Sequence, residues 1–170
     1  MMGEEVTTSN IQKLISKMPA NTSPLEKVIL CNDGTVQTLL SVIFGVPVRV
    51  EVLSQSESDS YIVRWSRLVA EYSPDNIVVV CLAESIISKK TKYKGFITGI
   101  TEKHMGIGQL ISSIQIDTKR SIVGIYADDN VFARTYTISS IENEDDYCLN
   151  AQLSVTITET FLKSVYDKLK

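Results

Sequence analysis

Runs in which apolar and polar residues alternate are the feature that most constrains the fold of this chain. The clearest run extends from Leu153 to Phe161. Side chains on a β-strand point to opposite faces in turn, so this run predicts a strand with one apolar face. Glu159 falls on that apolar face. A buried carboxylate is costly unless it has a cation or a ligand as its partner, which makes Glu159 a candidate site residue.

Three other runs place one charged residue on a face that otherwise carries apolar side chains. These residues are Arg67 in the run 61–71, Glu84 in the run 78–86 and Arg134 in the run 132–138. Charged residues are almost never fully buried unless they are paired. One such charge in a protein is common, but four in separate strands predict a polar cavity inside the fold.

Each of these charges also has a structural explanation. Glu159 and Arg134 fall roughly opposite each other if a short turn joins their strands, so they can form a buried ion pair. Arg67 and Glu84 are near cross-strand neighbours if their runs form a hairpin. The sequence leaves both the ligand-binding and the structural explanations open.

Length and charge limit the class of protein. A chain of 170 residues fits a single domain with a sizeable core. The net charge of −3 gives no electrostatic basis for binding nucleic acid or an anionic membrane, and no apolar run is long enough to span one. The acidic N-terminus lacks the basic and apolar regions of a signal peptide, which predicts a cytoplasmic protein.

Cysteine and histidine are too few and too scattered to indicate a metal site. Cys31, Cys81 and Cys148 are far apart and odd in number, which predicts reduced thiols. The single histidine, His104, lies in a polar loop and is expected to be solvated. No glycine-rich phosphate loop is present, since Gly106-Ile107-Gly108 lacks a third glycine. We therefore expect neither a metal nor a cofactor. The polar cavity predicted above indicates a small molecule as the partner.

The order of the predicted elements favours an α+β fold. Apolar stripes and capping residues predict helices at 9–18, 24–31, 35–44, 106–114 and 160–169. Alternation predicts strands at 48–53, 61–72, 77–87, 119–126, 131–140 and 149–159, with a polar connection at 55–60. The segment 95–103 fits neither pattern clearly. Strands that follow one another predict a six-stranded, mainly antiparallel sheet with flanking helices and an internal ligand cavity.

This order resembles the chorismate lyase-like family, and most closely its archaeal branch. The shared order is a helix, an Asp-Gly turn, a helix, a strand, a long hairpin, a glycine-containing loop helix and three strands. The resemblance covers roughly residues 24–166. It implies an enzyme that releases pyruvate from chorismate and leaves 4-hydroxybenzoate, without metal or cofactor. The same fold also serves as the effector domain of GntR-type regulators, so the alternative is a non-catalytic module that binds an aromatic carboxylate.

The resemblance also implies roles for individual residues. The turn that ends at Thr35 would close over the ligand. Arg67 matches an arginine that grips the substrate carboxylate, with Arg64 as the alternative register. Glu159, in Thr158-Glu159-Thr160-Phe161, matches the glutamate of the catalytic pocket. It would act as a general acid–base group or hydrogen-bond the ring hydroxyl.

Two further segments match, and two positions depart from the family. Backbone N–H groups near Ile107 and Gly108 would hold the other end of the ligand, and Arg134 matches an arginine of the penultimate strand. Glu84 stands where the family has a cation, and Gln109 where it usually has an arginine. Chorismate carries two carboxylates, and a cavity with two arginines and two glutamates has a formal charge near zero. Either Glu84 points away, or it is protonated, or the ligand is different.

Overall fold

The computed structural model describes residues 8–102, 105–141 and 152–169. Four features of the sequence lie outside these residues: His104, Cys148, the acidic segment 142–146 and the start of the predicted strand 149–159.

Short helices precede, interrupt and follow the strands. They are α1 (Thr8–Ser16), α2 (Pro24–Cys31), α3 (Val36–Phe44), α4 (Lys94–Thr101), α5 (Ile107–Ser113) and α6 (Lys163–Tyr166), which continues into a 3-10 turn at Asp167–Leu169. The ambiguous segment 95–103 is therefore largely helical. Among the residues that the structure describes, no helix has the length and apolar character needed to cross a bilayer.

The strands form one antiparallel sheet, as predicted. They are β1 (Val48–Glu57), β2 (Tyr61–Ser73), β3 (Asn76–Ser88), β4 (Thr118–Ala127), β5 (Val131–Ser140) and β6 (Ser154–Leu162). Their order across the sheet is β1-β2-β3-β6-β5-β4, and every neighbouring pair is antiparallel. The α+β class with a six-stranded antiparallel sheet is thus confirmed.

Aromatic packing explains why the last strand is longer than predicted. The sequence predicts a helix from residue 160, but β6 continues through Leu162. Phe161 stacks on Phe132 of the neighbouring strand, with ring centroids 4.9 Å apart. Tyr166 of α6 meets both rings edge-on. Offset and edge-to-face pairs of this kind add to the free energy of burial. They therefore favour the strand conformation as far along the chain as Phe161.

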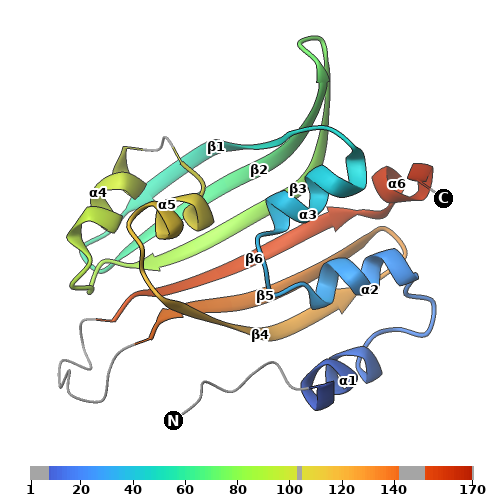
Figure 1. Ribbon diagram of the computed structural model, residues 1–170, viewed down its shortest axis with the longest axis horizontal. Coiled ribbons are helices and arrows are strands. Elements are labelled where there is room, and N and C mark those ends of the chain that lie inside the picture. The colour runs from blue at the N-terminus through green and yellow to red at the C-terminus, as the bar shows by residue number, and fades with distance from the viewer. Residues whose placement is uncertain (1–7, 103–104, 142–151, 170) are drawn as a thin grey trace.

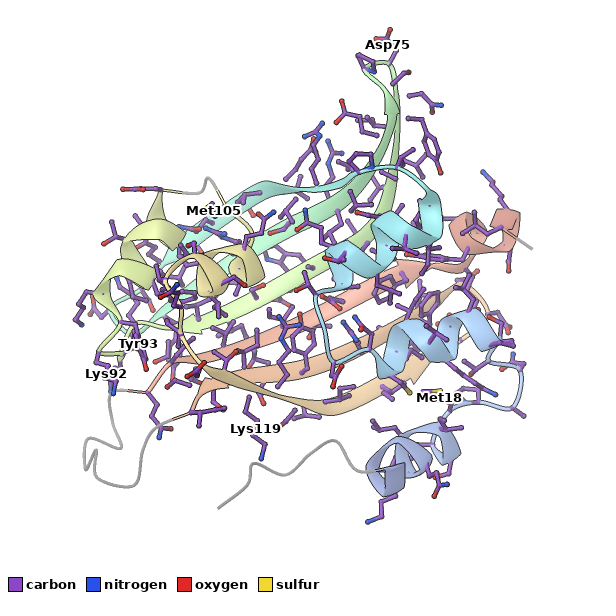
Figure 2. All side chains as sticks on the ribbon, viewed as in Figure 1. Met18, Asp75, Lys92, Tyr93, Met105 and Lys119 are labelled. Atoms are coloured by element: carbon purple, nitrogen blue, oxygen red, sulfur yellow. The ribbon has the colours of Figure 1, made fainter. Side chains whose placement is uncertain are left out.

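The helices α2, α3, α4 and α5 lie on one face of the sheet, here called the inner face (Figure 1). Beneath α2 and α3 is one apolar cluster, which contains Leu40, Phe44, Phe132 and Phe161. Beneath α4 and α5 is a second, which contains Phe96, Leu110, Ile138 and Ile157. Figure 2 shows side chains filling the layer between these helices and the sheet, while Asp75 marks the tip of the β2–β3 hairpin that extends beyond it.

A β-bulge in β3 decides which of its residues reach the inner face. Leu68 pairs with Cys81, but the next residue, Val69, pairs with Val79, so Val80 is the extra residue. Beyond such a bulge the alternation of side chains shifts by one position. Odd-numbered residues from Cys81 onward therefore point inward.

The opposite face, here called the outer face, carries large apolar side chains that no described helix covers. Those at least a third exposed on β2 and β3 are Tyr61, Trp65, Ile77, Leu82 and Ile86. Trp65, for example, is 47% exposed. The outer face of β2 is thus as apolar in sequence as its inner face, although only the inner face is packed.

The end of α3 requires a glycine. Gly45 follows the helix in the left-handed conformation, with φ of 68°. A side chain costs about 1–2 kcal/mol in this conformation. We expect Gly45→Ala to lower the free energy of unfolding by that amount in urea titrations.

Gly95→Ala is the matched control, because Gly95 lies in α4 and a Cβ there would meet nothing within 4 Å. It should leave the free energy of unfolding unchanged or raise it by up to about 1 kcal/mol. Equal losses for the two variants would contradict the assignment of the α3 terminus.

Candidate functional site

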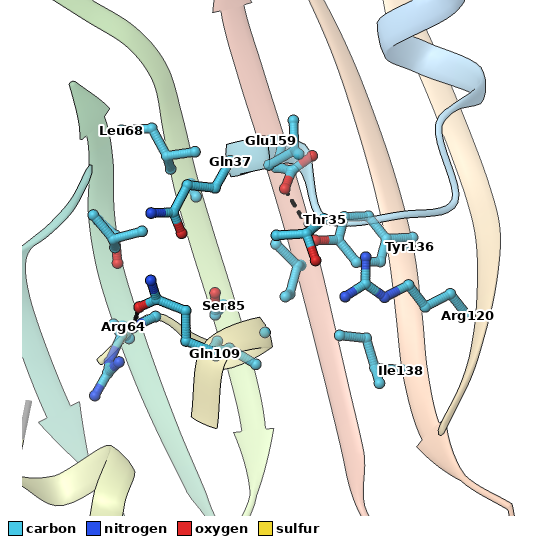
Figure 3. A pocket seen from close by; sticks show the side chains of 18 residues that line it. Thr35, Gln37, Arg64, Leu68, Ser85, Gln109, Arg120, Tyr136, Ile138 and Glu159 are labelled. Carbon is cyan, nitrogen blue, oxygen red and sulfur yellow. Dashed lines mark hydrogen bonds between the residues drawn. The ribbon is translucent and has the colours of Figure 1, made fainter. Parts of the chain in front are cut away.

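A pocket lies on the inner face, between the sheet and the start of α3 and α5. Its volume is about 70 Å³. Its lining comes from both apolar clusters and from every strand of the sheet, and the side chains that face one another across it are shown in Figure 3. The polar lining residues are Thr35, Gln37, Arg64, Ser66, Ser85, Gln109, Arg120, Tyr136 and Glu159.

Small side chains in the middle of the sheet create the space. Ser66 pairs with Ala83, and Ala83 pairs with Glu159, so the three form one row across β2, β3 and β6. Ser85 occupies the next inward position on β3. Since cross-strand neighbours lie about 4.5–5.5 Å apart, two or three small residues together leave a hollow. Glu159 forms the edge of this hollow.

Glu159 is held by two donors. It is 3% exposed and pairs directly across the β5–β6 ladder with Arg134, which is 2% exposed. Arg134 Nε donates to Glu159 Oε2 at 2.7 Å, and Tyr136 Oη donates to Oε1 at 3.0 Å. Burial raises the pKa of Tyr136 well above its usual value, and the charge of Glu159 adds to the rise. Tyr136 therefore remains a phenol and a donor at neutral pH.

Arg134 lies behind Glu159 and does not line the pocket. Its Nη1 donates to the carbonyl oxygens of Ile29, at 2.9 Å, and of Asn32, both at the C-terminal end of α2. A cation is favourable there because the helix dipole is negative at that end. The ion pair predicted as the structural alternative for Glu159 is thus present, and it extends to a helix terminus.

The start of α2 is fixed by a capping box. Ser23 Oγ accepts a hydrogen bond from the backbone of Glu26, and the Glu26 carboxylate accepts one from the backbone of Ser23. Pro24 at the first helical position is compatible with this arrangement. Arg134 binds the other end of α2, and the turn that follows this end leads to Thr35.

Arg64 is a buried cation in the pocket lining. It is 1% exposed. It donates to Gln55 Oε1 at 2.9 Å, to the Met105 carbonyl at 3.0 Å and to the Ile100 carbonyl. These bonds use three of its five N–H groups, so two remain. Burial lowers the pKa of Arg64, and within the described part of the chain no carboxylate lies within 4.0 Å of its guanidinium.

Arg120 is a second cation, on the other side of the pocket (Figure 3). Its Nη1 donates to the carbonyl oxygens of Asp33, at 3.3 Å, and of Gly34. Its guanidinium lies 5.9 Å from the centre of the Tyr136 ring, within the range of a cation–π interaction. Sequence patterns missed Arg120 because its strand is too polar for one charge to stand out.

Several predicted residues meet in this pocket. Thr35, Ile107 and Gly108 line it together with Glu159, although they come from separate parts of the chain. Ile107 and Gly108 belong to the first turn of α5, where backbone N–H groups have no acceptor within the helix. Gln109, one of the departures from the family pattern, also lines the pocket, and its Oε1 accepts from the Gly106 N–H at 3.2 Å.

The prediction that Arg67 and Glu84 share this cavity is wrong. Both lie on the outer face and are partly exposed. Arg67 pairs with Glu51 of β1, and Glu84 lies opposite Trp65 rather than Arg67. Two features caused the error: β2 is apolar on both faces, and the bulge at Val80 reverses the alternation in β3. Of the two arginines considered in β2, it is Arg64, the alternative register, that lines the pocket.

A shallow groove continues the pocket outward between α3 and α5. It shares Thr35, Gln37, Gly108 and Gln109 with the pocket, and its other lining residues are Thr38, Ser41, Ser112 and Ser113. The pocket itself is smaller than the roughly 300–1,000 Å³ of typical ligand pockets. A ligand larger than a few water molecules must therefore extend into this groove.

Comparison with known proteins adds no assignment. No family model matches the chain, and no curated protein sequence does so either. In the part of the chain that the structure describes, no three His, Cys, Asp or Glu side chains gather closely enough to hold a metal ion.

The buried ion pair leads to a stability prediction. Removing one partner leaves the other charge buried, which typically costs about 3–5 kcal/mol. We expect Arg134→Met and Glu159→Gln each to lower the free energy of unfolding by about this amount. The double variant should lose less than the sum, because it leaves neither charge unpaired.

Arg67→Met is the control, since it breaks a partly exposed pair that is worth about 0–1 kcal/mol. Urea unfolding of the four variants measures these differences. Strictly additive losses at Arg134 and Glu159 would show that the two side chains are not coupled.

Proposed function

We propose that the pocket binds an aromatic or cyclohexadiene carboxylate and that the chain is a chorismate pyruvate-lyase-like enzyme. The observation that carries the proposal is Arg64, a residue of the pocket lining that is almost fully buried and has no described carboxylate within 4.0 Å of its guanidinium. Burying an unpaired cation is costly. An anionic ligand would offset that cost, and a guanidinium can bind a carboxylate through two parallel hydrogen bonds in a bidentate geometry.

The balance of charge around the pocket supports an anionic ligand. The sequence alone suggested two arginines and two glutamates, with a formal charge near zero. Glu84 lies on the outer face, and Arg134 offsets the charge of Glu159. Arg64 and Arg120 then remain as the cations of the lining. The difficulty of placing chorismate, a dianion, next to Glu84 is thereby removed.

The reaction needs little from the protein. In chorismate, loss of the proton at ring carbon C4 and cleavage of the ether bond at C3 leave an aromatic ring, 4-hydroxybenzoate. The departing enolpyruvate takes up a proton and becomes pyruvate. Because aromatisation makes the elimination strongly favourable, the protein has to orient the dianion, exclude water and stabilise charge on the departing oxygen.

Glu159 is our candidate catalytic residue. Its carboxylate borders the hollow and is fixed in orientation by Arg134 and Tyr136. From this position it would accept the C4 proton or a hydrogen bond from the ring hydroxyl. Backbone donors near Ile107 and Gly108 would bind the other end of the ligand. We place this reaction in the cytoplasm, as expected from the sequence.

One observation favours the second candidate function, a binding module without catalysis. Both oxygens of Glu159 already accept hydrogen bonds within the protein. A carboxylate held in this way is already engaged by the protein itself, so neither oxygen is free of a partner when a ligand arrives. The module would then retain the resting geometry with an aromatic acid bound.

Pyruvate release distinguishes the two functions. Chorismate incubated with the protein should yield pyruvate and 4-hydroxybenzoate in equal amounts, above the rate without protein. Glu159→Gln should lower turnover by about 10²–10⁴-fold if Glu159 transfers the proton, with less effect on 4-hydroxybenzoate binding. Glu84→Gln, the matched outer-face change, should leave turnover intact. Tight binding of 4-hydroxybenzoate without any pyruvate would establish the module instead.

Binding of 4-hydroxybenzoate tests the role of Arg64 separately. Loss of a charge-assisted hydrogen bond costs about 1.5–3 kcal/mol, so Arg64→Met should weaken binding by roughly 10–150-fold in calorimetric titrations. Arg67→Met, three residues along the same strand but on the outer face, should leave the affinity unchanged. Equal affinities in both variants would refute the assignment of Arg64.

A further inference from the structure

Arg120 has donors that the protein itself does not use. Its Nη1 is occupied by the turn between α2 and α3, but Nε and Nη2 donate to no group in the described residues. No carboxylate of those residues lies within 4.0 Å of it. Arg120 is only partly buried, so its charge does not by itself require a partner. The orientation of the Arg120 side chain is more informative, because it points across the pocket toward Thr35 (Figure 3).

Gly108, which carries no side chain, lies beside the free end of Arg120. A Cβ built on Gly108 would lie 3.6 Å from Arg120 Nη2 and 3.9 Å from Thr35 Oγ1. The Thr35 hydroxyl makes no hydrogen bond within the described part of the chain. The Arg120 guanidinium and the Thr35 hydroxyl thus both lie next to Gly108, which has no side chain to separate them from the pocket. Ligand oxygens in the pocket that reach both groups could accept hydrogen bonds from both.

We propose that Arg120 and Thr35 bind a second carboxylate, so that the pocket selects dicarboxylates over monocarboxylates. This inference rests on the proposed function only in that the ligand carries a carboxylate at Arg64. The two arginines come from β2 and β4, on opposite sides of β3, β6 and β5. One ligand can therefore meet both only if its anionic groups are at separate ends.

The surroundings of Arg120 fix its orientation before a ligand arrives. The carbonyl oxygens of Asp33 and Gly34 hold one side of the guanidinium, and the Tyr136 ring lies against it. Donors that are already oriented bind an anion without a further loss of side-chain freedom. The same contacts place Arg120 next to Thr35, which directly follows the turn that Arg120 holds.

A pair of ligands that differ by one carboxylate tests the proposal. The probes are 3-(carboxymethoxy)benzoate and 3-methoxybenzoate, titrated by calorimetry at low salt. The wild type should bind the dicarboxylate more tightly. Arg120→Gln should weaken binding of the dicarboxylate by about 10–100-fold and leave that of the monocarboxylate within twofold. Arg67→Gln, on the outer face, should change neither. Equal weakening for both ligands would mean that Arg120 only supports the fold and would overturn the proposal.

Gly108→Ala provides a second variant that does not depend on removing Arg120. The added methyl group would make only ordinary contacts of 3.6 and 3.9 Å, so the melting temperature should stay the same or rise. It would nevertheless project toward the two groups assigned to the second carboxylate and hinder its approach, and the preference for the dicarboxylate should fall. An unchanged preference would overturn the proposal.

The outcomes separate this inference from the lyase proposal. Selective loss of dicarboxylate binding without pyruvate release would support the role of Arg120 and reject the lyase activity. Pyruvate release that persists at the wild-type rate in Arg120→Gln would reject the role of Arg120 and leave the lyase activity standing.

Discussion

The ion pair between Arg134 and Glu159 is the interaction on which the rest of the site depends. It joins β5 and β6 at the centre of the sheet and reaches the C-terminal end of α2 through two backbone carbonyls. The helix then leads into the turn that supplies Thr35 to the pocket. An isolated charge at this depth would be strongly unfavourable, so the pair, the phenol of Tyr136 and the helix terminus form one interdependent unit. Glu159 can border a ligand pocket only because Arg134, which lies on the side away from the pocket, balances its charge.

The sequence predicted the elements well and the faces of two strands poorly. Period-two alternation found every strand, and capping residues found the helices other than α4, since these signals are local. The face of a strand is not local when both sides are apolar, as Trp65 and Leu68 on opposite faces of β2 illustrate. In β3 the alternation is correct on each side of Val80 but does not continue across it. Glu159 and Arg134 were assigned to the correct face because β5 and β6 pair without a bulge, although Arg134 does not line the pocket.

The pocket illustrates a second limit of sequence reasoning. Charges on apolar faces attract attention, whereas the space for a ligand is made by the small side chains Ser66, Ala83 and Ser85, which appear unremarkable in the sequence. Arg64 was available as an alternative register, and its burial among neutral oxygen acceptors distinguishes it from Arg67. Only the register of the sheet shows that these residues adjoin Glu159.

The single extra residue in β3 has a consequence for how this pocket can change during evolution. Val80 determines that Ser85, and not Glu84, faces the hollow. Gain of one residue between Val80 and Glu84 would exchange the two and introduce a negative charge opposite Arg64, because a slip of one position moves every side chain to the other face. The charge of the pocket is therefore set by the length of a strand as well as by its composition. Relatives that differ by a one-residue insertion there should recognise ligands of a different charge, even where the arginines themselves are unchanged.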